Sequence, residues 1–138
     1  MRIDLPSKEE LISGGIVIPL APKGDSWSKK SLGVFSKKSG VYIHYCDGEI
    51  IYVGQTTLGK RGTFGDRMRR EFHETSASND YLHRFIKEHV DCVKTRFLDL
   101  DEIDKIVITD TITLTPQRKA LILEQILIGQ YEPRGNRM

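Results

Sequence analysis

The chain has few cysteines, no long apolar run and no large excess of charge of one sign. Only Cys46 and Cys92 occur among its 138 residues. They are far apart and outside any CxxC pair, so the sequence offers no cysteine-rich zinc site. We therefore expect two reduced thiols in a cytoplasmic protein. No stretch approaches the roughly 20 apolar residues that span a bilayer, and the N-terminus lacks the apolar core of a secretory signal, so no membrane association is expected.

The formal net charge of +2 does not by itself indicate a nucleic-acid-binding protein. The charge is unevenly distributed, however. Residues 59–73 contain five Lys or Arg and two Asp or Glu, whereas residues 91–110 contain six acidic and three basic side chains. A basic face of this kind suits a phosphate backbone. Charge counts alone favour a solvated surface.

The length suggests one domain with one core. Residues 1–39 are rich in Pro, Gly, Ser and Lys, and we interpret them as an N-terminal arm that precedes a domain over residues 40–138. Val41–Tyr45 and Glu49–Val53 are β-rich, and the Asp47-Gly48 pair between them predicts a tight hairpin turn.

Helices dominate the rest of the predicted domain. One begins with Asp66 as its N-cap and ends near Thr75. Another begins at Thr115-Pro116, reaches Tyr131 and is apolar on nearly every side, so we expect it to be buried. The remaining features are a helix around residues 82–89, a strand over residues 93–97, and an insertion near residues 99–114 with a β-rich segment at 106–114.

Glu124 lies in the middle of the last predicted helix. A carboxylate among apolar residues is costly unless it is paired or binds a metal. Mg²⁺ is often held by one or two protein carboxylates together with several waters. Glu124 is therefore a candidate Mg²⁺ ligand, with Mn²⁺ as an alternative metal. The helical pattern alone favours another interpretation, in which Glu124 forms a salt bridge or marks the polar edge of the helix.

Arg69 and His73 are four residues apart, on one face of a predicted helix. Together they could hold a phosphate, although alone they favour an exposed basic face. Tyr42 and Tyr52 lie on the two hairpin strands, where packing is the usual role of tyrosine. A phenol assisted by nearby cations could instead orient or deprotonate a water molecule. His44 is interpreted as a surface or packing histidine.

The order of these features resembles the GIY-YIG nuclease superfamily. Gly40-Val41-Tyr42, followed ten residues later by Tyr52-Val53-Gly54, is similar to the paired GIY and YIG motifs, with Val in place of Ile in both. The family then has a helical Arg followed four residues later by His or Tyr, a Glu on a later helix, and an Asn about a dozen residues further on. The matching residues, within a resemblance that covers Gly40–Asn136, are Arg69, His73, Glu124 and Asn136.

This resemblance implies an α/β (α+β) fold with a small antiparallel β-sheet flanked by helices. It implies a metal-dependent endonuclease that hydrolyses phosphodiester bonds in DNA, with Glu124 as ligand of a single Mg²⁺. Arg69 and His73 would act around the scissile phosphate, and Tyr42, in preference to Tyr52, would activate the attacking water. Substrate contacts are expected from Gly54, Lys60, Arg67, Arg70 and Asn136.

The domain organisation is similar to that of stand-alone phage nucleases and compact restriction enzymes. Specificity for double-stranded DNA would then come from the N-terminal arm and the insertion. Cutting both strands with one site per chain favours a homodimer or a higher homo-oligomer. Two alternatives remain open: a structure- or lesion-specific DNA repair nuclease, and an inactive DNA-binding module on the same scaffold.

Overall fold

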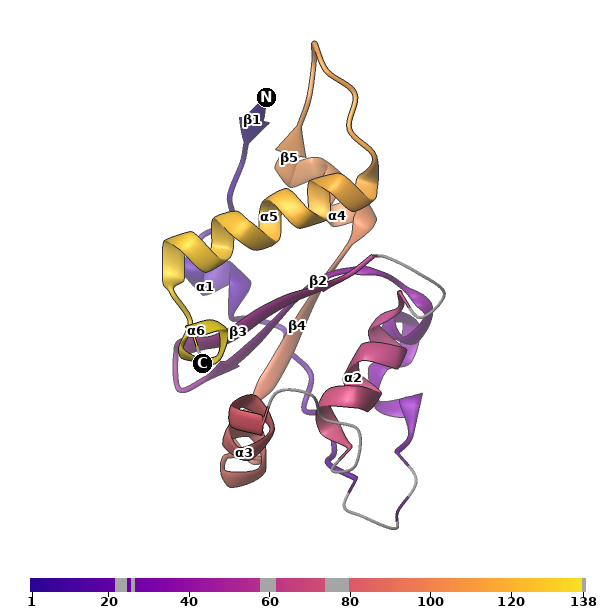
Figure 1. Cartoon of the computed structure of the whole chain (residues 1–138), viewed down its shortest axis with the longest axis vertical. Coiled ribbons are helices and arrows are strands. Elements are labelled where there is room, and N and C mark those ends of the chain that lie inside the picture. The colour runs from indigo at the N-terminus through magenta and orange to yellow at the C-terminus, as the bar shows by residue number, and fades with distance from the viewer. Residues whose placement is uncertain (22–24, 26, 58–61, 74–79, 138) are drawn as a thin grey trace.

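The predicted hairpin lies at the centre of the structure, a computed structural model that describes residues 1–21, 25, 27–57, 62–73 and 80–137 (Figure 1). Strands β2 (Gly40–Cys46) and β3 (Glu49–Thr56) pair antiparallel, which confirms the prediction. Asp47 and Gly48 both have positive φ, 51° and 75°, as a tight hairpin turn requires. Strand β4 (Lys94–Asp99) pairs antiparallel with the other side of β2. The strand order β3-β2-β4 therefore leaves β3 at an edge.

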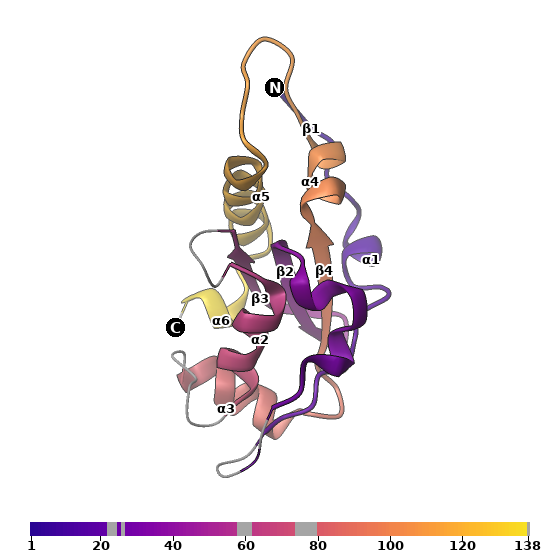
Figure 2. The same ribbon diagram turned by 90° about the vertical axis from the view of Figure 1, so that its right-hand side faces the viewer.

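Both faces of β2 are buried, because helices cover the sheet on both sides. Val41 and Ile43 pack in one apolar cluster with side chains of α5 (Pro116–Tyr131) and α4 (Leu100–Ile106). Tyr42, which points to the opposite face, packs in a second cluster with side chains of α2 (Phe64–Phe72) and α3 (Asp80–Glu88). Figure 2 shows α2 and α3 on the side of the sheet that faces the viewer. This arrangement confirms the fold class predicted from the sequence.

Helix α2 begins earlier than predicted. Its N-cap is Thr63, whose hydroxyl accepts a hydrogen bond from the Asp66 amide at 3.2 Å and donates one to the Asp66 carboxylate at 2.9 Å. This reciprocal pair makes Asp66 the third helical residue and not the cap. The helix ends at Phe72, and His73 follows in extended conformation with φ −108° and ψ 125°. The predicted helical stripe of Arg69 and His73 is therefore wrong.

Helix α5 has the predicted bounds, but its burial is one-sided. The Thr115 hydroxyl caps it by accepting a hydrogen bond from the Arg118 amide at 3.2 Å, and Pro116 occupies the first turn. Its buried residues are Lys119, Ala120, Leu123 and Leu127, while Glu124 is only half-buried. The prediction of a buried helix therefore holds for one side of α5 only. That side packs on one face of the sheet, and the opposite side of the helix does not contact the sheet.

Residues 1–39, interpreted from the sequence as an arm, contribute to both apolar clusters. Strand β1 (Arg2–Ile3) pairs with β5 (Val107–Ile108), the only part of the β-rich segment 106–114 that forms a strand. Leu11 ends helix α1 (Lys8–Leu11) and is buried in the α5 cluster. Ile18, and Leu32 of the 3₁₀ helix η1 (Lys29–Lys37), are buried in the α2 cluster.

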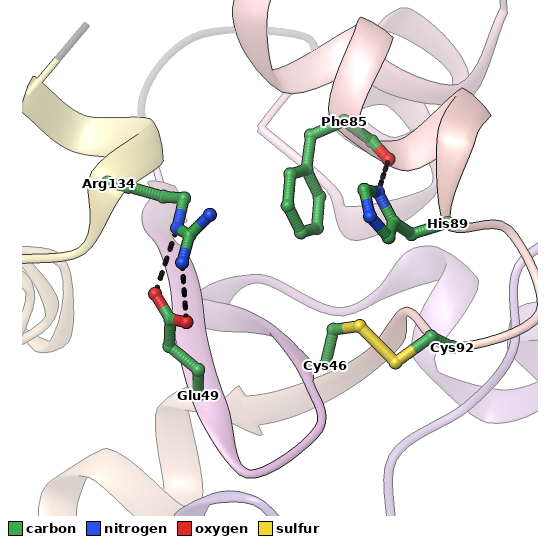
Figure 3. The surroundings of a disulfide bond; sticks show 6 residues. All are labelled: Cys46, Glu49, Phe85, His89, Cys92 and Arg134. Carbon is green, nitrogen blue, oxygen red and sulfur yellow. Dashed lines mark hydrogen bonds and ion pairs between the residues drawn. A yellow bond between two sulfur atoms is a disulfide. The ribbon is translucent and has the colours of Figure 1, made fainter.

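A disulfide joins Cys46 to Cys92, with a Cα–Cα distance of 5.3 Å (Figure 3). Cys46 ends β2, and Cys92 lies between α3 and β4. Because β4 pairs with β2, the two cysteines meet although 46 residues separate them. The expectation of two reduced thiols was therefore wrong, and with it the cysteine argument for a cytoplasmic location. No helix within the described part of the chain is both long and apolar enough to cross a membrane.

Removing this disulfide is expected to lower the free energy of unfolding by about 4 kcal/mol, because the crosslink closes a loop of 46 residues in the unfolded chain. The measurement is a urea titration of the oxidised and reduced wild type and of a Cys46→Ala/Cys92→Ala variant. The reductant should destabilise the wild type and leave the variant unchanged, which controls for effects of the reductant itself. Equal midpoints for the oxidised wild type and the variant would contradict the prediction.

Candidate active site

A buried hydrogen-bonded cluster lies between the sheet and α2. Tyr42 on the central strand is fully buried, and its hydroxyl donates a hydrogen bond to Oε2 of Glu71. Nε of Arg67 donates to the same hydroxyl at 3.1 Å and to Glu71 Oε2 at 3.2 Å. Arg67 and Glu71 reach Tyr42 together because they are four residues apart on one face of α2.

His44 completes the buried side of this cluster. It is two residues from Tyr42 on β2 and therefore points to the same face of the sheet. Its Nε2 lies 2.6 Å from Glu71 Oε1, and its Nδ1 lies 2.7 Å from the hydroxyl oxygen of Thr95, its partner across β4. His44, Glu71 and Thr95 are 0%, 8% and 1% exposed. Both oxygens of the buried carboxylate therefore have partners, which offsets the cost of burying the charge.

Tyr52 lies at the outer side of the cluster, on edge strand β3. Its side chain is only partly buried, and the charge of Arg67 acts on its hydroxyl. The ring centroids of Tyr52 and Tyr42 are 6.0 Å apart, as are those of Tyr52 and His44. Tyr52 is therefore the partly exposed aromatic residue beside the buried Tyr42 and His44.

The ionisation of the phenols follows from their surroundings. Burial, followed by the charge of Glu71, raises the pKa of Tyr42 well above its usual value of 10.0, against the opposing effect of Arg67. The same two causes, burial first, raise the pKa of Tyr52. Interaction with Tyr42 raises the pKa of Arg67 in turn. At neutral pH the site therefore presents two neutral phenols and one arginine cation.

Glu124 lies on α5, which packs along β3. Burial raises the pKa of its carboxyl above the usual range, while a hydrogen bond from Gln125 and the charge of Arg67 act against that shift. Glu124 is therefore within electrostatic range of Arg67. A single half-buried carboxylate suits Mg²⁺, which commonly keeps several waters and takes few protein oxygens. Among the described residues, only Cys46, Asp47 and Cys92 form a group of three potential metal ligands close to one another. The two cysteines of that group are joined in the disulfide.

Gly54 lies opposite Tyr42 in the β2–β3 register. A Cβ atom at this position would overlap the Tyr42 ring, coming within 2.8 Å of Cε1. Gly54 was predicted to contact substrate, and the structure places it directly under the tyrosine ring. Its lack of a side chain is what allows the ring to lie across β3.

Gly54→Ala is accordingly expected to displace the Tyr42 ring and to lower any activity of this site on the order of tenfold to 100-fold, since small displacements of catalytic groups have effects of that size. Stability should fall by about 1–3 kcal/mol from overpacking. The measurements are turnover on the substrate proposed below and thermal unfolding. Gly129→Ala is the control, because a Cβ there meets nothing within 4 Å. Equal activity of the two variants would contradict the expected role of Gly54.

The side chain of Asn136 forms hydrogen bonds with the backbone of the edge strand β3. Its side-chain amide donates to the Val53 carbonyl and accepts from the Val53 amide, both at 2.8 Å. This pair holds α6 (Arg134–Arg137) against β3, in the way that a neighbouring strand would. Asn136 was predicted to contact substrate, and the structure places its side chain on the scaffold that carries Tyr52.

The other predicted residues lie apart from the cluster. Arg69 is exposed, and it is two residues from Arg67, or roughly 200° around the helix. His73 follows α2, with its Nε2 3.1 Å from the Asp25 carbonyl oxygen. Arg70 is half-buried on α2, and its Nε has no hydrogen-bond partner within the described part of the structure. Lys60 lies outside the described residues.

Three residues of the cluster were missed by the sequence reasoning: His44, Glu71 and Thr95. The spacing of Arg67 and Glu71 was available as a signal, since it equals that of Arg69 and His73. The family pattern favoured the second pair because it has His or Tyr at the later position. His44 was two residues from a singled-out tyrosine, which already placed it on the same face.

No family model and no curated protein matches this chain. Solved structures do. One is the GIY-YIG N-terminal endonuclease domain of UvrC from Thermotoga maritima bound to magnesium, its catalytic divalent cation, with 24% identity over 78% of this chain and 92% of that one and a TM-score of 0.47. A point mutant of that domain with one asparagine replaced by alanine, also bound to its catalytic divalent cation, has 24% identity over 78% and 91% and a TM-score of 0.46. Both of these solved structures are of a GIY-YIG N-terminal endonuclease domain.

Proposed function

We propose that this chain is a metal-dependent endonuclease that hydrolyses phosphodiester bonds in DNA. The observation that carries the proposal is the placement of Tyr52, Arg67 and Glu124 around the β3 edge of the sheet. A half-buried phenol, a cation and a carboxylate come there from three different elements, β3, α2 and α5. These are the groups that hydrolysis of a phosphodiester needs: a contact for water, a positive charge for the phosphate and a ligand for a metal.

Each group has a distinct task in this scheme. Arg67 stabilises the negative charge that grows on the phosphate oxygens, through the fixed fork of its guanidinium. Glu124 would hold the Mg²⁺, which supplies a Lewis acid for the phosphate and the leaving oxygen. Tyr52 orients the attacking water through its hydroxyl.

The exposure of the two tyrosines favours Tyr52 over Tyr42 as the hydroxyl that meets the water. Tyr42 is 0% exposed, so its hydroxyl is out of reach of substrate, whereas Tyr52 is only partly buried. Tyr42 packs behind Tyr52, with their ring centroids 6.0 Å apart. This assignment reverses the preference for Tyr42 that was drawn from the sequence.

Incubation of the purified protein with supercoiled double-stranded plasmid tests the proposal. We expect nicked or linear DNA with Mg²⁺ or Mn²⁺ and intact plasmid with EDTA. Discrete fragments would favour a restriction-like or phage-type enzyme, and nicking or a smear would favour low sequence specificity. If plasmid, branched DNA and damaged DNA all remained intact with both metals, the proposal would be overturned in favour of a DNA-binding module. Circular dichroism of the same sample establishes that the protein tested is folded.

A further inference from the structure

We propose that Cys46, Asp47 and Cys92 form a Zn²⁺ site when the disulfide between the two cysteines is reduced. The inference goes beyond the proposed function, because none of these residues is assigned a part in cleaving DNA. In this structure the two sulfur atoms are bonded to each other, so the disulfide and the metal are alternative states of one place in the fold.

The ligand atoms of the three side chains already lie close together. The two sulfur atoms and a carboxylate oxygen of Asp47 are all within 4.8 Å of one another. In a tetrahedral zinc site, Zn–S bonds of about 2.3 Å and Zn–O bonds of about 2.1 Å place neighbouring ligand atoms roughly 3.5–4 Å apart. The group therefore has the dimensions of a zinc site once the two sulfur atoms separate.

The hairpin and the strand pairing hold the three residues in place without help from the disulfide. Cys46 ends β2, and Asp47 follows it in the turn, with φ 51°. Cys92 lies just before β4, whose pairing with β2 extends to Lys94 opposite Tyr45. Because backbone hydrogen bonds maintain this pairing, the two cysteines remain neighbours in the folded, reduced protein. Figure 3 shows their side chains directed at each other from separate segments of the chain.

The donor set favours Zn²⁺ over the Mg²⁺ proposed at Glu124. Thiolate sulfur is a soft ligand that suits Zn²⁺, whereas Mg²⁺ prefers oxygen. The two thiolates and the carboxylate carry three negative charges, which attract a divalent cation. Three protein ligands leave the fourth position of the tetrahedron to water.

The surroundings give the site a shielded side and an open side. Cys46 is 5% exposed and belongs to the apolar cluster of α2, and Cys92 is partly buried against the same cluster. Asp47 is exposed, and it lines a surface hollow of about 490 Å³ together with Cys92, Asp91 and Lys94. A metal ion and a small reductant can therefore reach Cys92 from solvent, while apolar side chains shield Cys46 on the inner side.

The change of state balances with a dithiol as reductant. A thiolate of the dithiol attacks the Cys92 sulfur, the S–S bond breaks, and Cys46 leaves as a thiolate. The second thiol of the reductant then attacks the mixed disulfide, releases Cys92 as a thiolate and closes a cyclic disulfide. The protein gains two electrons, the dithiol loses two electrons and two protons, and the protons go to solvent. Zn²⁺ then binds the two thiolates and Asp47 without further oxidation or reduction.

Binding of Co²⁺, a spectroscopic substitute for Zn²⁺, tests the site. The protein is reduced with a phosphine and freed of excess reductant under nitrogen. We expect thiolate-to-cobalt charge-transfer absorption in the reduced protein and none in the oxidised protein. One equivalent of Zn²⁺ per chain should abolish the absorption. A carboxylate gives no such band, so metal bound at Glu124 does not interfere.

Asp47→Asn separates the part of the carboxylate from that of the cysteines. Asn-Gly is a preferred pair for a tight turn with positive φ, so the hairpin should be preserved. We expect the Zn²⁺ affinity of the reduced protein, measured by competition with a chromogenic chelator, to fall at least about tenfold, since even the outer contacts of a metal ligand have effects of that size. Asp101→Asn is the matched control and should bind Zn²⁺ as the wild type does, because Asp101 is an exposed residue of the first turn of α4.

Absence of the charge-transfer band from the reduced, folded protein would overturn the proposal, as would equal Zn²⁺ affinities of the wild type and Asp47→Asn. One zinc ion per two chains would also overturn it, because the thiolates would then come from different molecules. If reduction alone unfolds the chain, Zn²⁺ should restore the circular dichroism spectrum of the oxidised protein, since a metal that binds the folded form stabilises it. Failure to restore that spectrum would contradict the site. None of these measurements involves DNA cleavage, so failure of this site and failure of the proposed function are distinguishable.

Discussion

Glu124→Gln is expected to lower DNA cleavage on the order of 10³-fold. Glutamine has nearly the shape of glutamate but lacks the negative charge that would hold Mg²⁺. No second protein carboxylate is proposed as a ligand, so none could compensate. The measurements are plasmid cleavage and the binding of Mg²⁺ by calorimetry, and both should fail together in the variant.

This variant should remain folded, which separates a loss of metal from a loss of structure. Burial raises the pKa of the Glu124 carboxyl, so the charged form is disfavoured at this position and a neutral amide removes that cost. Among the described residues, the Glu124 carboxylate accepts a side-chain hydrogen bond from Gln125, at 3.3 Å and on the exposed surface. We expect an unchanged or slightly higher melting temperature. Cleavage at the wild-type rate with Mg²⁺ still bound would place the metal elsewhere.

The parts of the fold that depend on neighbouring residues were predictable from the sequence. The hairpin follows from two β-rich segments around Asp47-Gly48, where local sterics set the turn. The bounds of α5 follow from Thr115-Pro116 at its beginning, where a capping hydroxyl meets a residue that suits the first turn. Such signals act within a few residues and need no knowledge of the tertiary structure.

The misplaced start of α2 explains why the sequence analysis selected the wrong pair of side chains on this helix. Thr63 and Asp66 are both residue types that cap helices well, and the sequence analysis considered only Asp66. In the structure they act together, with Thr63 as the cap and Asp66 as its partner three residues later. The helix then ends at Phe72, before His73. The pair that joins the buried cluster is Arg67 with Glu71, and the predicted pair of Arg69 and His73 is split between the helix and the loop that follows it.

The buried cluster and the disulfide depend on tertiary contacts and were out of reach of local reasoning. Thr95 meets His44 because β4 pairs with β2 in a register that no nearby residue specifies. Cys46 and Cys92 meet for the same reason, across 46 residues. A buried histidine beside a tyrosine on one strand indicates a polar network only when its partners are known.

Arg67→Lys and Arg69→Lys are expected to differ sharply, although the two arginines are two residues apart on one helix. Lysine keeps the positive charge, so attraction to the DNA backbone is preserved in both variants. At position 67 it loses the guanidinium Nε that donates to both Tyr42 and Glu71, at 3.1 and 3.2 Å, and with it the planar fork that could bind a phosphate. We expect Arg67→Lys to lower single-turnover cleavage on the order of 10³-fold, within the range for loss of a preorganised charge at a phosphate.

Arg69→Lys is the matched control, because the chemical change is the same and the side chain is exposed on the other side of α2. Its cleavage rate should remain within a few-fold of that of the wild type, with equal DNA affinity for both variants. Circular dichroism would establish that α2 is intact in each. If Arg69→Lys were the inactive variant and Arg67→Lys the active one, the sequence-based pair of Arg69 and His73 would be the one that acts at the phosphate. The buried cluster around Glu71 would then be a structural network.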